Sequence, residues 1–450
     1  MRSGRSLLIL VLVAAGLGAY IYFVEAGRDP FAADAVTREK VFTLETGTID
    51  EVEITNADAE VTRVTRTGAS WMIEGPSPAE ADTVQVSTLT SSLESLERTK
   101  VIDENPTSAT PFGLDPARVR VAFTTTGETT PKVLLIGSKT PTGGDLYARI
   151  DGEPAVFLIG GYLEDTFNKK PFDLRDKTVL KFARTEVNAI TLTQGNTRVT
   201  LDKPAGEWRL SAPAHARADG AAVDGLIGQI FQARMTNLST SDAESNLREY
   251  GLDRPQVVVT IGTGSSKAEL AIGGTEDDTH FYARDLSRPL VFSVDKTFVD
   301  ELLKKSDDFR VKDVFAYRSF SATGMDVTLG GITYTFAKTK PEGENSLEHW
   351  SQTAPATEQS LEEPKFDDFL TTMSNLRAES FAATPARGGE TIIVTARFGD
   401  AAMPQTETVT LRKSDDVVQA IRNGEPGAAV VSTTDFDRAV GLIKELTGAK

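Results

Sequence analysis

The sequence contains no cysteine and only three histidines. Without cysteine the chain has no disulfides, no thiolate nucleophile, no cysteine zinc site and no lipid-bearing cysteine of a bacterial lipoprotein. The histidines, His215, His280 and His349, stand far apart and in different sequence surroundings. Each domain must therefore be stabilised by the burial of apolar side chains, and a recurring histidine site is not expected.

Signatures of common catalytic and nucleotide-binding sites are also missing. Neither Gly-x-Ser-x-Gly nor His-Glu-x-x-His occurs, Gly262-Thr-Gly264 lacks the third glycine of a dinucleotide loop, and Gly143-Gly144 lacks the Gly-Lys-Ser/Thr of a phosphate loop. The segment Glu276–His280 offers oxygen and nitrogen ligands, but an exposed acidic hairpin tip is usually just solvated. We therefore predict no cofactor, no metal and no catalytic residue. A hydrolase with paired carboxylates stays an alternative, because the fold sets their separation.

Positive charge is in short supply, since 65 acidic residues against 48 lysines and arginines give a net charge of −17. Such a chain is repelled by nucleic acid and by anionic lipid headgroups, so neither is expected as its main partner. The hydrophobic share of 40% is ordinary for folded proteins. With 450 residues the chain has room for about two to four domains with sizeable cores.

One long uncharged run is present, from Leu7 to Val24. As a helix its 18 residues span roughly 27 Å, enough for the hydrocarbon core of a bilayer. Arg2 and Arg5 precede the run and Glu25 follows it, so the positive-inside rule leaves the N-terminus in the cytoplasm. A cleaved signal peptide is the alternative, but the run stays apolar and aromatic where a small-x-small cleavage site would be needed.

We therefore predict a retained anchor in the cytoplasmic (inner) membrane. Residues 1–24 are expected to form the cytoplasmic tip and the transmembrane helix, and residues 25–44 a polar tether. The rest of the chain is expected on the periplasmic or extracytoplasmic side of that membrane.

A six-residue pattern, Trp-x-x-x-x-Pro, contains all three tryptophans of the chain. Its copies are 137 and 142 residues apart, which indicates a repeated unit. They run from Trp71 to Pro76, from Trp208 to Pro213 and from Trp350 to Pro355. Alternating apolar residues surround each tryptophan, and the proline that follows cannot continue a strand ladder. We interpret the rings as core anchors at a strand end rather than as platforms for sugars.

Further motifs recur between the first two units. Phe112-Gly-Leu-Asp returns as Tyr250-Gly-Leu-Asp, where Gly113 and Gly251 are expected to supply the positive φ of a turn. Leu-Ile-Gly137 corresponds to Ile-Gly273 in the same way. Several motifs at nearly one offset indicate a duplication.

The third unit lacks the Gly-Leu-Asp turn and has Gln419-Ala-Ile-Arg422 in place of Tyr-Ala-Arg, so we predict a degenerate, capping copy. The predicted boundaries are 45–178 for repeat unit 1, 179–315 for repeat unit 2 and 316–450 for repeat unit 3.

The apolar pattern within a unit predicts both strands and helices. Alternation at Val52 and Ile54 begins three short antiparallel strands. Asp82 is then placed to cap an amphipathic helix of about 16 residues, with Gln85 completing a capping box. Four more strands and a short helix near 162–169 follow. The predicted fold is α+β, with tandem repeats of mainly antiparallel sheet, one or two helices per unit, and one N-terminal transmembrane helix.

Two sets of charged residues recur at an offset of 135 residues. Arg149 and Arg284 alternate with tyrosines on a strand, so they are candidate contacts for a partner or ligand. The second set flanks the unit junctions, where an ion pair or a backbone clamp is the favoured interpretation and a shared ligand site the alternative. Its members are Asp173, Arg175, Asp308 and Arg310.

The combination of these motifs resembles a bacterial family catalogued as domain of unknown function forty-three-forty, over about residues 45 to 315 and weakly beyond. The resemblance implies a membrane-anchored envelope protein, often encoded beside ABC-transporter components similar to those of gliding-motility export systems. The family has no established catalytic residues, so it assigns none to this chain.

Together the anchor, the repeats and the missing motifs predict a non-enzymatic accessory or scaffold protein of an ABC-type export or envelope complex. The expected partners are the membrane and an ABC-transporter permease or another envelope protein. One alternative is a module that binds cell-wall glycan or an exported polymer through Arg149, Arg284 or exposed aromatics. The other is the envelope hydrolase with paired carboxylates.

Overall fold

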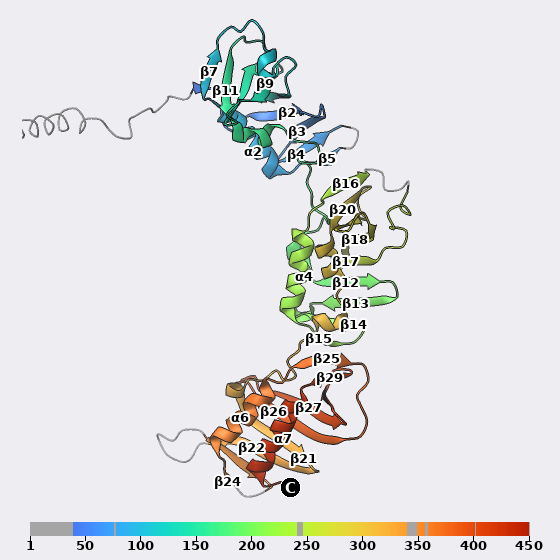
Figure 1. The fold of residues 1–450 in the computed structure, drawn as a ribbon. Coiled ribbons are helices and arrows are strands. Elements are labelled where there is room, and N and C mark those ends of the chain that lie inside the picture. The colour runs from blue at the N-terminus through green and yellow to red at the C-terminus, as the bar shows by residue number, and fades with distance from the viewer. Residues whose placement is uncertain are drawn as a thin grey trace, which may run out of the picture. The chain divides into compact units, whose positions relative to one another are not determined.

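The computed structural model describes residues 39–75, 78–240, 246–339, 349–355, 359–400 and 402–449. These residues form three nine-stranded sheets with the same strand order (Figure 1). The chain divides into two compact units, residues 1–176 with one of the nine-stranded sheets and residues 177–450 with the other two. The predicted α+β fold of repeated, mainly antiparallel sheets is therefore confirmed.

The first sheet is two meanders that meet at its centre, in the order β5-β4-β3-β2-β8-β9-β10-β11-β7. Its strands are β2 (Ile49–Thr55), β3 (Val61–Thr67), β4 (Ser70–Glu74), β5 (Ala79–Glu80), β7 (Lys100–Asp103), β8 (Val119–Thr125), β9 (Lys132–Lys139), β10 (Asp145–Ile150) and β11 (Val156–Gly160). A separate two-stranded ladder joins β1 (Glu39–Lys40) to β6 (Glu97–Arg98). The helices are α2 (Thr83–Glu94) and the short α3 (Glu164–Phe167).

The second sheet contains β12 (Ala189–Gln194), β13 (Thr197–Asp202), β14 (Arg209–Ala212), β15 (Ala216–Arg217), β16 (Asn237–Thr240), β17 (Val257–Thr263), β18 (Ser266–Thr275), β19 (His280–Asp285) and β20 (Val291–Asp295). Helices α4 (Gly220–Gln232) and α5 (Lys296–Leu302) belong to it. Its order, β15-β14-β13-β12-β17-β18-β19-β20-β16, repeats that of the first sheet.

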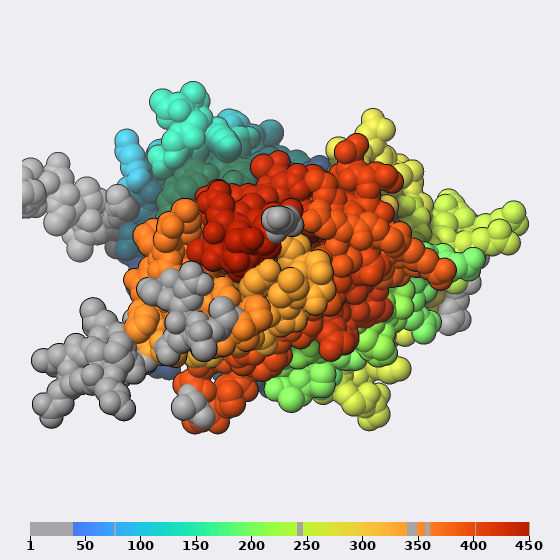
Figure 2. Space-filling view, turned by 90° about the horizontal axis from the view of Figure 1, so that it is seen from below, coloured from blue at the N-terminus to red at the C-terminus, as the bar shows by residue number. Residues whose placement is uncertain are grey.

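The third sheet contains β21 (Ala322–Leu329), β22 (Ile332–Thr339), β23 (His349–Ala354), β24 (Gln359–Ser360), β25 (Ala378–Ala382), β26 (Glu390–Phe398), β27 (Gln405–Ser414), β28 (Val417–Arg422) and β29 (Ala428–Val431). Its helices are α6 (Glu363–Ser374) and α7 (Thr433–Thr447), and the deep-red residues of α7 form part of the surface in Figure 2. The repeat that has lost most sequence motifs has kept the whole topology.

Helices cover one face of each sheet and close the main core, and in the third repeat both α6 and α7 contribute buried residues to it. In α2, Val86, Leu89 and Leu93 are buried at helical spacing. The Asp82 carboxylate accepts hydrogen bonds from the N–H groups of Val84 and Gln85, so the predicted N-cap is confirmed.

The helix is shorter than predicted, 12 residues instead of about 16. It ends at Glu94 because Glu97 and Arg98 belong to the β1–β6 ladder. The predicted capping box is wrong, since Gln85 contributes its backbone N–H and not a reciprocal side-chain bond.

The edge strands β7, β16 and β25 were not predicted from the sequence. Each follows the covering helix and crosses to the far edge of its sheet. In β7 three of four residues are exposed, so no alternation of buried and exposed side chains marks it.

The opposite face of the first two sheets carries a second, smaller apolar cluster. It joins the Gly-Leu-Asp turn to the middle strands, through ring contacts of 5.0 Å between Phe112 and Tyr147 and 4.9 Å between Tyr250 and Tyr282. In the third repeat Gln419 stands in the tyrosine position, is 8% exposed, and accepts a hydrogen bond of 2.6 Å from the N–H of Ala386. A polar contact has therefore replaced the aromatic pair.

The three tryptophans lie in the main cores, at 4%, 6% and 6% exposure for Trp71, Trp208 and Trp350. A basic side chain covers each ring, with Arg66, Lys203 and Lys338 at 5.0, 5.5 and 5.4 Å from the ring centres.

The peptide bonds before Pro213 and Pro355 are cis. Pro76 and the predicted anchor Leu7–Val24 lie outside the described residues. None of the helices within the described residues combines the length and the apolar character that crossing a bilayer requires.

Candidate functional site at the junction of the second and third repeats

The second and third repeats are joined by residues 309–314, an extended segment that forms isolated β-bridges rather than a regular strand, and we call it the junction strand. On one side it extends the edge of the second sheet. The carbonyl of Phe309 accepts a hydrogen bond of 2.8 Å from Asp219, and the N–H of Val311 donates one of 3.1 Å to Arg217. Ala218 and Arg310 form the β-bridge between these bonds.

On its other side the same strand is bonded to the third repeat. The N–H of Val314 donates to the carbonyl of Leu376 at 3.0 Å, and the N–H of Ala378 donates to the carbonyl of Lys312 at 2.8 Å. In an extended segment, successive backbone N–H and C=O groups point to opposite sides. The same six residues can therefore form hydrogen bonds with both repeats. The junction strand therefore connects the edges of two sheets.

A buried ion pair holds the chain just after the junction strand. Glu407 on β27 is 5% exposed and pairs with Arg422 on β28. Its carboxylate also accepts hydrogen bonds from the N–H groups of Ala316 and Tyr317, at 3.0 and 2.9 Å. Arg422 in turn donates to the carbonyl of Val314 at 3.1 Å. The pair thus satisfies backbone groups that would otherwise be buried without partners.

A second ion pair links the two repeats directly. Arg217 on β15 of the second repeat contacts Glu425, in the turn between β28 and β29 of the third, with 2.5 Å between Nε and Oε1. The guanidinium of Arg217 also donates to the carbonyl of Asp313 at 2.9 Å. Both side chains are about four-fifths buried, so the pair is better shielded from water than an ordinary surface ion pair.

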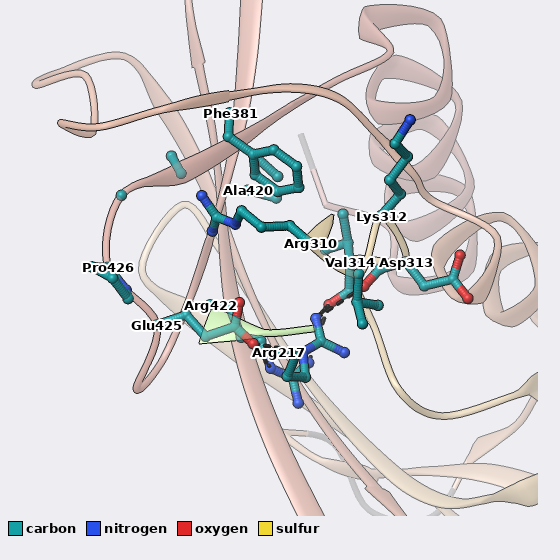
Figure 3. A pocket seen from close by; sticks show the side chains of 14 residues that line it. Arg217, Arg310, Lys312, Asp313, Val314, Phe381, Ala420, Arg422, Glu425 and Pro426 are labelled. Carbon is teal, nitrogen blue, oxygen red and sulfur yellow. Dashed lines mark hydrogen bonds and ion pairs between the residues drawn. The ribbon is translucent and has the colours of Figure 1, made fainter. Parts of the chain in front are cut away.

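Arg310, on the junction strand itself, is bound differently. It is 9% exposed, and its guanidinium lies 3.8 Å from the ring centre of Phe381 on β25. Figure 3 shows the side chain running beneath that ring toward the turn of Glu425 and Pro426. No described residue forms a hydrogen bond or an ion pair with its guanidinium. Burial lowers the pKa of Arg310, and the nearby charge of Glu425 opposes that change.

These groups surround a small hollow. Its volume is about 20 Å³, room for about one water molecule, and it opens to solvent. Arg217, Arg310 and Arg422 line it together with Glu425 and Phe381 (Figure 3). Its chemistry is that of a cationic pocket, closed on one side by an aromatic ring.

The predicted junction residues have separate roles in the structure. The carboxylates of Asp173 and Asp308 accept backbone hydrogen bonds from Lys170 at 2.9 Å and Lys305 at 2.8 Å, so the predicted backbone clamp is confirmed for the aspartates. Arg310 forms no ion pair with any described residue and stacks on Phe381 instead.

The candidate contact residues Arg149 and Arg284 are not among the lining residues of this pocket and lie on β10 and β19. Both are half-buried beside the smaller apolar clusters, and in both the Nε atom is buried without a hydrogen-bond partner. A role in binding a partner stays a prediction for these two residues.

Sequence reasoning missed Arg217, Glu407 and Glu425, which belong to no repeated motif, and it noted Arg422 only as part of the altered Tyr-Ala-Arg motif. Only the fold brings these residues together. The sequence did mark Arg310 through the recurrence of its position in both junctions.

The histidines do not meet in the structure. His280 pairs with Asp277, with 2.9 Å between Nδ1 and Oδ2, at the hairpin tip considered as a metal site. Within the described ranges, no group of three or more histidine, aspartate or glutamate side chains is placed to hold a metal ion.

Fold and junction define a tandem-repeat protein in which buried charges connect the second repeat to the third. The chain belongs to the family described as "Domain of unknown function (DUF4340)", which matches residues 71–207 and 208–391. The second match begins at Trp208, the first residue of the repeated tryptophan pattern. The family carries no assigned activity.

Other known proteins add little. No curated protein matches the sequence. One solved structure, described as "Crystal structure of DNA polymerase sliding clamp from Pseudomonas aeruginosa with ligand", is 7% identical with a TM-score of 0.14, over 87% of this chain and 94% of that one. A likeness this low carries no argument about fold or function.

Proposed function

We propose that the chain is a non-enzymatic scaffold or accessory protein of an ABC-type export or envelope complex. In this proposal Leu7–Val24 anchors it in the cytoplasmic membrane, and the three repeats lie on the extracytoplasmic side. The link to ABC export comes from the family resemblance, and the anchor from the sequence alone.

The observation that supports a scaffold best is the junction strand. Both of its edges are hydrogen-bonded, and the charges around it connect two repeats. Charged groups in an active site usually converge on a cleft that admits a substrate. Here Glu407 and Glu425 instead pair with arginines of the same junction. Repeats joined in this way present surface to partners, as repeat arrays commonly do.

Co-purification tests the proposal. The tagged full chain would be extracted in mild detergent from its native membrane, and the recovered proteins quantified by mass spectrometry. We expect ABC permease and ATPase subunits to be enriched. The control is residues 1–44 fused to an unrelated soluble domain, which retains the predicted anchor and lacks the repeats. Recovery of the full chain without transporter subunits, or equal recovery with the control, would contradict the proposal.

Arg149 and Arg284 favour a second candidate, the binding of an anionic glycan or exported polymer. The two arginines occupy equivalent strand positions, and neither forms an ion pair with a described residue. Retention on immobilised acidic polymer should fall in the double variant Arg149→Ala/Arg284→Ala. Retention should be unchanged in Arg63→Ala, which removes an exposed arginine that already pairs with Glu53.

A further inference from the structure

We infer that the junction pocket binds a small oxyanion, a carboxylate or an inorganic phosphate, on the guanidinium of Arg310. This goes beyond the scaffold proposal and does not depend on it. The starting point is that Arg310 is 9% exposed and that no described residue forms a hydrogen bond or an ion pair with its guanidinium, although its backbone N–H donates to the carbonyl of Asp307. None of its guanidinium nitrogens is among the described side-chain atoms that are buried without a hydrogen-bond partner, so its N–H donors still reach solvent in the pocket and are open to a ligand.

Arg217 and Arg422 each pair with a carboxylate, whereas the Arg310 guanidinium has no carboxylate partner among the described residues. Glu425 is engaged by Arg217 at 2.5 Å, and Glu407 is engaged by Arg422 and by two backbone N–H groups. The lining thus carries four cationic side chains, those of Arg217, Arg310, Lys312 and Arg422, against the carboxylates of Glu425 and Asp313, while Glu407, which is not part of the lining, pairs with Arg422. An added anion would supply the missing negative charge.

Asp313, the remaining carboxylate of the lining, does not change this balance. It contacts Arg318 at 2.7 Å and Arg377 at 3.5 Å, and neither of those arginines lines the pocket. No carboxylate of the lining is therefore left over for Arg310.

The shape of the pocket selects the ligand class. The volume of about 20 Å³ admits about one oxygen atom, and because the hollow opens to solvent, the rest of a small anion would lie in its mouth. The ring of Phe381 covers one face of the guanidinium, so a ligand approaches the forked N–H edge. That fork matches two oxygens of a carboxylate or phosphate, which a spherical ion cannot provide.

Hydrogen exchange of the junction strand provides the test. The full chain would be measured in sodium chloride and, at equal ionic strength, in a titration with sodium phosphate or sodium formate. The two anions separate tetrahedral from carboxylate ligands. We expect exchange of the Val311 and Val314 amides to slow several-fold, saturating with anion concentration. Amides of β8 in the first repeat report the general effect of salt on stability.

Three variants make the test specific. Arg310→Met keeps an apolar side chain against Phe381 and should lose the response to anion, while Arg310→Lys keeps the charge without the fork and should weaken it. The control, Arg438→Gln, removes an exposed arginine elsewhere in the third repeat and should respond like the parent chain. For each variant, the exchange rate with anion is compared with the rate of the same variant without anion. A variant that exchanges faster in the absence of anion therefore does not affect the result.

The inference is supported if either anion slows exchange in the parent chain but not in Arg310→Met. Equal slowing in Arg310→Met would reveal a general salt effect and overturn it. The absence of any slowing in the parent chain would mean that water alone fills the pocket, and would also overturn it.

Discussion

Two repeated glycines have a steric role that their sequence pattern did not reveal. A Cβ on Gly137 would lie 2.1 Å from the carbonyl oxygen of Phe112, and one on Gly273 would lie 2.2 Å from that of Tyr250. The Gly-Leu-Asp turn thus rests on the Ile-Gly strand, which explains why the two motifs occur together in the first two repeats. The third repeat lacks both.

Replacing Gly137 with Ala should therefore destabilise the first repeat. The backbone oxygen of Phe112 cannot move away as a flexible side chain would, so we expect a loss of at least about 2 kcal/mol in urea unfolding. The matched control is Gly225→Ala on α4, where nothing lies within 4 Å of the added Cβ. That change should be neutral or stabilise by about 0.5–1 kcal/mol. Equal effects of the two substitutions would contradict the steric explanation.

The hairpin tip at His280 should respond to pH. The hydrogen bond with Asp277 is the main cause that raises the pKa of His280, and it also lowers the pKa of Asp277. The histidine contribution to stability is complete below about pH 6.5 and is lost as pH rises through the folded pKa. The aspartate contribution is present above about pH 3.9 and is lost as pH falls through its lowered pKa. The tip is therefore most stable between about pH 4 and 6.5.

Titration of the His280 ring by NMR checks this. Asp277→Asn should lower the pKa of His280, because it removes the acceptor that stabilises the charged ring. Asp300→Asn removes a carboxylate that pairs with Lys296 on the neighbouring helix and should leave the titration unchanged. A His280 titration that is the same in Asp277→Asn and the parent chain would contradict the assignment.

At the scale of secondary-structure elements, capping and alternation were readable from the sequence, and edge strands were not. Asp82 and Asp219 cap their helices with two backbone hydrogen bonds each, as an aspartate ahead of an apolar helix predicts. The edge strand β7 has few buried side chains. Its position depends on pairing with β11, which is distant in sequence, so local pattern could not reveal it.

The Glu407–Arg422 pair should strongly stabilise the backbone at Ala316 and Tyr317, whose N–H groups donate to the Glu407 carboxylate. Glu407→Gln leaves the arginine partly buried without its close counter-charge, which typically costs about 3 kcal/mol or more. Exchange of the Ala316 and Tyr317 amides should accelerate by about two orders of magnitude. The control, Asp368→Asn, breaks the more exposed pair between α6 and α7 and should change stability by less than about 1 kcal/mol. Unchanged exchange in Glu407→Gln would show that the pair contributes little.

At the scale of the whole molecule, the sequence predicted three repeats from three tryptophans but not how the repeats connect. Motif spacing counts units, whereas the junction depends on residues that differ between copies. Arg217 and Glu425 are 208 positions apart, and nothing in their local sequence marks them as partners. The question of separate domains or one body is answered for residues 177–450, where the junction strand hydrogen-bonds to both repeats.

Charge exchange across this junction offers a test of its role. Arg217→Glu would place two carboxylates together and remove the donor to Asp313, so exchange of the Val311 and Val314 amides should accelerate about tenfold or more. The double variant Arg217→Glu/Glu425→Arg restores opposite charges and should recover part of the protection. If the double variant exchanges as fast as the single one, attraction between these two side chains does not stabilise the junction.

The covered tryptophans have a practical consequence. Each repeat contains one indole, buried in its core beneath a basic side chain, and the chain has no other tryptophan. Replacing two of the three with phenylalanine would leave a single emitter whose spectrum reports one repeat alone. Three such variants would show whether the repeats unfold together or in sequence. The fluorescence of these variants would therefore measure how cooperatively the three repeats unfold.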